Sequence, residues 1–168
     1  MNDSLIGYSD MFDPELNIES SLVRGIVINA LTLFERTIDA FLSNHFCRDK
    51  SRASELMTHV FATKYITFEN KRMIFQSLTD THHKEYKKLN LGNIHKSLEK
   101  FNRHRNILAH CVVDLKPKSI ELFKSTKEVT FLKFEKSIEQ EIYTRETAAQ
   151  LANEIYDFIK PIAQMIDM

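Results

Sequence analysis

Residues 22–34 read LVRGIVINALTLF, and this stretch decides the fold. Its apolar side chains fall on more than one face of a helix, so it predicts a helix that is central to a bundle or shared with a second chain. The preceding DPEL starts such a helix well, because Asp13 can cap it and Pro14 suits the first helical position. Only Gly25 interrupts the pattern, so one long helix is expected over residues 14–46.

Apolar spacing predicts four more helices, over about 50–63, 68–80, 93–113 and 137–166. Glycine and proline number only 3 each, which disfavours a turn-rich all-β fold. Before the last helix, SIELFKSTKEVTFLKFEK holds two short β-prone runs around a polar centre and predicts a hairpin over 118–136. The expected fold is all-α: an up-and-down bundle of about five helices with a short β-hairpin before the last helix.

The chain of 168 residues is expected to form a single helical domain over 1–168, with 1–12 as a flexible arm. Its polar start lacks the basic region and apolar run of a signal peptide. The apolar run at 22–34 is too short to span a bilayer. A cytoplasmic protein that makes no contact with membranes is therefore expected.

Composition limits the classes of function. Lys and Arg number 23, as do Asp and Glu, and this balance argues against a bulk electrostatic attraction to nucleic acid, although a local basic patch stays open. Cys47 and Cys111 are expected to be reduced thiols. The 7 histidines form no zinc pattern, so neither a metal nor another cofactor is expected.

A polar cluster stands out in residues 100–114, KFNRHRNILAHCVVD, within a predicted helix. On a helical projection Arg103, Asn106 and His110 share one face, which is either a solvated surface or a functional site. The opposite line is the predicted core stripe, made of Ile94, Leu98, Phe101, Leu108 and Val112, and Arg105 falls on that line as well.

Arg105 has two explanations on this helix. Its apolar stem could lie along the core while its guanidinium reaches solvent. Alternatively, a buried guanidinium is held by a carboxylate such as Glu35, Asp39 or Glu154, because unpaired burial of a charge is costly. The sequence does not select between these partners.

The octapeptide RHRNILAH, residues 103–110, resembles the signature of the HEPN superfamily (higher eukaryotes and prokaryotes nucleotide-binding domains). In that signature an arginine precedes a histidine by four to six intervening residues, often with Asn, His or Asp directly after the arginine. Arg105, Asn106 and His110 fit the shorter spacing, and Arg103 and His104 with His110 fit the longer one. The order of helices around the motif over 14–166 is also similar to many bacterial members.

This resemblance implies a metal-independent endoribonuclease that cleaves RNA through the 2′-OH, possible as a toxin or a phage-defence component. Its site would be composite, with Arg and His side chains meeting at a homodimer interface. In that site His110 would be the acid and base, Arg105 would bind phosphate and Asn106 would orient the reacting groups. Arg103 and His104 would make auxiliary substrate contacts.

The alternative that the resemblance allows is a non-catalytic module. Such a module would bind RNA, a nucleotide or a protein partner, for example an antitoxin or a nucleotidyltransferase. The zero net charge favours this alternative mildly.

Overall fold

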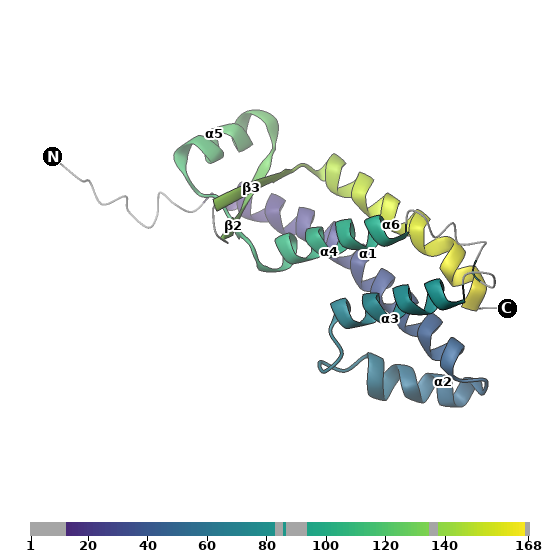
Figure 1. The fold of residues 1–168 in the computed structure, drawn as a ribbon. Helices are drawn as coiled ribbons and strands as arrows, with labels where there is room; N and C mark the ends of the chain where they lie inside the picture. The colour runs from purple at the N-terminus through teal and green to yellow at the C-terminus, as the bar shows by residue number, and fades with distance from the viewer. Residues whose placement is uncertain (1–12, 83–85, 87–93, 135–137, 167–168) are drawn as a thin grey trace. The chain divides into compact units, whose positions relative to one another are not determined.

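A computed structural model describes residues 13–82, 86, 94–134 and 138–166, so the arm predicted over 1–12 lies outside the described residues. The described part is mostly helical, as predicted, and also contains a small antiparallel sheet (Figure 1). Its elements are α1 (Pro14–Phe46), α2 (Lys50–Leu56), the π-helical turn η2 (Met57–Phe61), α3 (Phe68–Thr81), α4 (Ile94–His110), β1 (Val112–Val113), α5 (Pro117–Thr126), β2 (Val129–Phe134), β3 (Ile138–Tyr143) and α6 (Arg145–Ile166).

The chain packs as two compact units. Among the described residues, the first unit comprises 13–28 and 105–151, and the second comprises 29–104 and 152–166. The first therefore holds the sheet, α5 and the motif residues from Arg105 onward. The second holds α2, η2 and α3.

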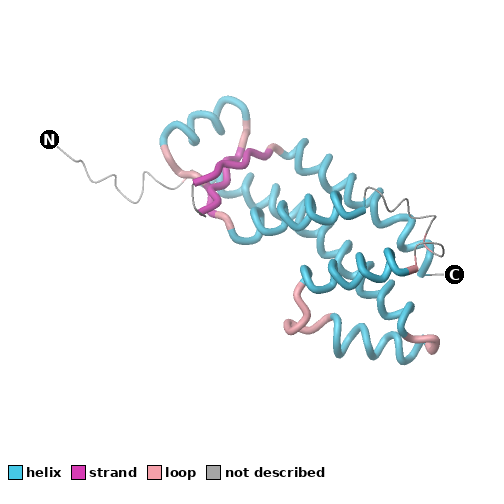
Figure 2. The backbone as a smooth tube through the Cα atoms, in the orientation of Figure 1, coloured by secondary structure: helices cyan, strands magenta, loops and turns pink. Residues whose placement is uncertain are grey.

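The sheet of the first unit, whose strands are magenta in Figure 2, has the strand order β1-β2-β3, and both pairings are antiparallel. Directly opposed residues in such a pair point to the same face. One face is buried through Val129, Phe131 and Tyr143. On the other face Thr130 and Leu132 are buried as well. Four large apolar residues around them are about half exposed or more: Val112 at 51%, Phe134 at 62%, Ile138 at 60% and Ile142 at 49%.

The hairpin lies later in the chain than predicted. Residues 117–126 form helix α5, which Figure 1 shows beside β2 and β3, and the hairpin is made by β2 and β3. The local reason is that Pro117 occupies the first helical turn and Lys127 ends the helix in the left-handed conformation, at φ 59°. Because β3 uses residues that were expected in the last helix, α6 begins only at Arg145. The Arg145 guanidinium donates two hydrogen bonds of 2.6 Å to the Glu19 carboxylate.

Helix α4 is shorter than predicted and ends at His110. Leu98, Phe101 and Leu108 of the predicted core stripe are buried, whereas the side chain of Ile94 lies outside the described part. Val112 was wrongly assigned to this stripe: the chain leaves the helix before it, and its side chain is exposed on the sheet.

Aromatic rings hold the second unit together around Phe34 of α1. Its ring centroid lies 5.5 Å from that of Phe68 on α3, 5.7 Å from Phe101 on α4 and 5.6 Å from Phe158 on α6, all edge to face. Edge-to-face pairs of this kind stabilise by about 0.5–1.5 kcal/mol each beyond the area they bury. Phe34 is fully buried, so one side chain joins three other helical segments to α1.

A charged cluster is also buried in the second unit. The Lys71 ammonium lies 2.7 Å from Glu35 and 2.9 Å from Asp39, and Lys71 is 2% exposed. One lysine therefore serves two carboxylates, and the Oδ1 atom of Asp39 has no hydrogen-bond partner among the described residues. Burial raises the pKa of the Asp39 carboxyl, although its hydrogen bond to Lys71 opposes this rise.

Replacing Lys71 by Met leaves Glu35 and Asp39 without their shared cation. We expect the free energy of unfolding at neutral pH to fall by about 3–5 kcal/mol, the range for removing one partner of a buried ion pair. Urea denaturation followed by circular dichroism measures the loss. Lys100→Met is the matched control: the Lys100 ammonium pairs with Glu154 at the surface, where the loss should stay within about 1 kcal/mol.

The loss in Lys71→Met should shrink in acid. Because burial raises the pKa of Asp39, the folded protein takes up a proton on this carboxyl at a higher pH than the unfolded chain. Between the two pKa values falling pH favours the folded state, and losing the Lys71 hydrogen bond widens that interval. A difference from wild type that stays constant from neutral to mildly acidic pH would contradict this account.

Candidate functional site

The end of helix α4 is held by Arg24 of α1, and both lie in the first unit. The guanidinium donates one hydrogen bond to the carbonyl oxygen of Leu108 and another, of 2.6 Å, to that of Cys111. These are carbonyls of the last helical turn and of the residue just after it. A cation is the favoured partner at this end of a helix, where carbonyls lack intrahelical donors.

The same guanidinium also contacts the sheet. Its central carbon lies 4.7 Å from the ring centroid of Phe131 on β2, a cation–π distance. Burial lowers the pKa of the Arg24 guanidinium, which stays charged at any ordinary pH. Arg24 therefore joins α1, the end of α4 and β2, and it fixes the backbone on both sides of His110.

Asn106 and His110 are exposed residues of the motif. Both side chains are exposed, and they lie four residues apart on α4, so they are neighbours on one face of the helix. Ile107 and Leu108, between them in sequence, are buried in the first unit. Asn106 and His110 therefore lie away from the core, as the helical projection predicted, whereas Ile107 between them belongs to the core.

Arg105 is half-buried and does not share that face. A five-residue step on an α-helix is a rotation of about 140°, so the backbone sends Arg105 and His110 in different directions. The carboxylates considered as its partners have other cations: Glu35 and Asp39 bind Lys71, and Glu154 binds Lys100. Helical geometry thus brings Asn106 and His110 together and leaves Arg105 apart from them.

Arg103 and His104 belong to the second unit. Arg103 is exposed and His104 is half-buried. Their predicted role as auxiliary substrate contacts stays a prediction.

The segment after His110 is fixed by a buried carboxylate. Asp114 is 2% exposed and accepts hydrogen bonds from the Lys116 amide at 3.1 Å, the Ser119 hydroxyl at 2.8 Å and the Gln140 amide group at 3.3 Å. These bonds join the end of β1, the start of α5 and β3. The carboxylate therefore fixes the conformation of the segment that follows the motif.

Sequence reasoning missed the roles of both Arg24 and Asp114. Arg24 has a visible signal, since it is the one charge within the apolar stretch 22–34. Asp114 has a weaker signal, an Asp shortly before Pro117, which is common where a new helix starts. Neither signal identifies the partner residue, because the partners are distant in sequence.

The exposed groups at the end of α4 are suited to proton transfer and to binding a polar ligand. An imidazole changes charge near neutral pH, and an amide can both donate and accept hydrogen bonds. No group of three or more His, Cys, Asp or Glu side chains in the described ranges could hold a metal ion. No helix in the same ranges is long and apolar enough to cross a membrane.

Replacing Arg24 by Met removes both bonds to the end of α4. We expect a loss of about 2–4 kcal/mol in the free energy of unfolding, since hydrogen bonds from a charged donor contribute about 1.5–3 kcal/mol each and are not additive. Amide hydrogen exchange should accelerate most at the end of α4 and in β1. Arg24→Lys should recover only part of the lost free energy of unfolding, because an ammonium cannot span two carbonyls as a planar guanidinium does.

Arg36→Met is the control for this variant, because Arg36 is an exposed arginine on the same helix. Its stability should stay within about 0.5 kcal/mol of wild type. Equal exchange rates at the end of α4 in Arg24→Met and Arg36→Met would show that Arg24 does not hold this helix end.

No protein-family model, curated protein or solved structure matches the chain.

Proposed function

We propose that the protein is a metal-independent endoribonuclease whose site is built around His110 at the end of α4. The observation that carries the proposal is the pairing of exposed Asn106 and His110 on a helix end that Arg24 holds in place. A fixed backbone and an exposed imidazole are the two requirements for a positioned acid–base group. The resemblance of residues 103–110 to the HEPN signature supports the same reading.

The chemistry needs no metal because RNA carries its own nucleophile. One imidazole takes the proton from the 2′-OH, and the resulting oxygen attacks phosphorus. The bond from phosphorus to the 5′-oxygen breaks, and the imidazolium just formed gives that leaving oxygen its proton. The products are a 2′,3′-cyclic phosphate and a free 5′-OH. Arg105 would stabilise the charge on the phosphate oxygens, to which a guanidinium can donate two hydrogen bonds at once.

A second copy of the chain would complete the site. A two-fold axis would bring the Arg105 of one copy to the His110 of the other, and so form two equal sites, each with one His110 as both base and acid. The five-residue step also points Arg105 away from the His110 of its own chain. Exposed apolar residues of the sheet support association: Val112, two residues after His110, and Ile142 lie on the same face.

His110→Ala should abolish most RNA cleavage in excess EDTA. A positioned acid–base group contributes about 10²–10⁴-fold, so the rate should fall by at least the lower figure. A short 5′-labelled single-stranded RNA resolved on a denaturing gel measures the rate. Phosphatase-resistant ends on the 5′ fragments identify the cyclic phosphate.

His59→Ala is the matched control, because His59 is an exposed histidine on η2, outside the motif. It should cleave at the wild-type rate. Equal activity in both variants would exclude His110 as the acid or base. RNA binding without cleavage by the wild-type protein would instead support the non-catalytic alternative.

Mixing two inactive variants tests the composite site. If Arg105 of one copy acts with His110 of the other, a heterodimer of Arg105→Ala and His110→Ala contains one site with both groups intact. Co-refolding the two inactive variants should therefore restore cleavage, to about half of the wild-type rate per heterodimer under simple counting of sites. Continued inactivity, with heterodimers demonstrated by mass spectrometry, would place both groups in one chain.

A further inference from the structure

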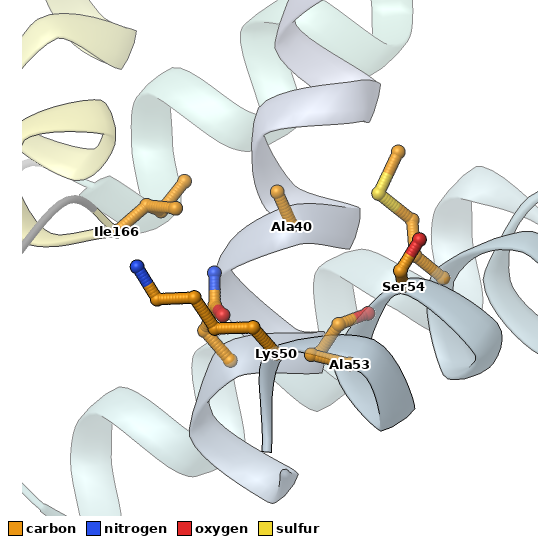
Figure 3. A pocket seen from close by; sticks show the side chains of 8 residues that line it. Ala40, Lys50, Ala53, Ser54 and Ile166 are labelled. Atoms are coloured by element: carbon orange, nitrogen blue, oxygen red, sulfur yellow. The ribbon is translucent and has the colours of Figure 1, made fainter. Parts of the chain in front are cut away.

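A pocket in the second unit lies between α1, α2 with its π-helical turn, and the end of α6 (Figure 3). Its volume is about 260 Å³. The small side chains of Ala40 and Ala53 leave the space open, and Figure 3 shows Lys50 and Ile166 on one side of it and Ser54 on the other. Polar and apolar groups therefore line the same hollow.

Ser43 is the unusual residue of this pocket. It is 2% exposed, yet its hydroxyl has no hydrogen-bond partner among the described residues. Other buried hydroxyls in these helices bond to their own backbone: Thr37 donates to the Leu33 carbonyl oxygen and Thr79 to that of Phe75, each at 2.9 Å. An unsatisfied buried polar group costs about 1–3 kcal/mol of folding free energy, so we expect the Ser43 hydroxyl to have a hydrogen-bond partner outside the chain.

The remaining polar groups of the pocket lack described partners as well. No hydrogen bond or ion pair to another described residue is made by the side chains of Asn44, Lys50 or Ser54. No described residue that lines the pocket is acidic, so the Lys50 charge is uncompensated there. Two hydroxyls, an amide and an ammonium thus surround one hollow without a carboxylate.

The wall of the pocket is locally irregular. Helix α2 passes into η2 at Met57, which lines the pocket, and single π-helical turns are frequent at functional sites. A second hollow of this unit, of about 460 Å³, differs in the side chains that line it. It is lined mainly by apolar and aromatic side chains, including Phe46, Met73 and Leu78, and contains no lysine or arginine.

We propose that the pocket between α1 and α2 binds a small organic carboxylate. The carboxylate would receive hydrogen bonds from the Lys50 ammonium and from the Ser43 hydroxyl and Asn44 amide. A short apolar body would contact Ala53 and Met57, consistent with a pocket at or below the lower end of the usual range for small ligands. This site is separate from the histidine motif and does not depend on ribonuclease activity.

Benzoate is the probe, and benzamide is its neutral counterpart. Titration of the full chain with benzoate, followed by amide NMR, should give saturable shifts centred on residues 43, 44, 53 and 54. Benzamide should bind about tenfold more weakly or worse, because it carries no charge for Lys50 to meet. Lys50→Met should weaken benzoate binding by about the same factor.

Ser43→Ala gives a readout that a purely structural serine would not. It should raise the thermal unfolding midpoint of the ligand-free protein, because an unsatisfied hydroxyl is removed, and at the same time weaken benzoate binding. A structural serine would lower the midpoint and leave binding unchanged. Lys64→Met is the control, since Lys64 is an exposed lysine of this unit outside the pocket, and it should bind benzoate as wild type does.

Three results would overturn the proposal. One is the absence of saturable shifts at these residues up to millimolar benzoate. Another is equal binding of benzoate by Lys50→Met and Lys64→Met. The third is a Ser43→Ala protein that is destabilised and binds benzoate as tightly as wild type.

Discussion

The first unit depends on the guanidinium of Arg24. It donates hydrogen bonds to the carbonyl oxygens of Leu108 and Cys111 and contacts the ring of Phe131. The end of α4 and strand β2 are therefore both fixed to the same residue of α1. A lysine in this place could not meet two carbonyls and an aromatic ring together. Half-burial of the charge carries a desolvation cost, and these contacts offset it. The position of His110 is therefore set by a residue distant from it in sequence.

The second unit buries two polar side chains that differ in whether they have a partner. Lys71 joins two carboxylates, so a charge inside the protein is compensated by partners within the chain. Ser43 is equally buried but has no described partner. The difference is informative, because a protein interior tolerates polar groups only when they are satisfied. A compensated group explains stability, whereas an uncompensated group beside a hollow points to a ligand.

Local patterns predicted most of the helices and the exposure of Asn106 and His110, since helical periodicity depends on neighbouring residues alone. They failed at 117–126, where β-prone residues outweighed Pro117, a local sign that a helix starts there. They also failed at Val112, because strand pairing with Leu132 ends the helix earlier than apolar spacing suggests. The bonds of Arg24 and the orphan hydroxyl of Ser43 could not be predicted at all, since both depend on contacts or cavities between distant segments.

The spacing within the motif has a consequence for regulation in the proposed enzyme. Asn106 and His110 share one face, whereas a rotation of about 140° separates Arg105 from His110. A site that needs both groups then needs either a long reach around the helix or a second chain. With a second chain, activity depends on protein concentration through the dimerisation equilibrium. The exposed apolar residues on the sheet, Val112 among them, would then control cleavage without touching RNA, because they would control assembly of the site.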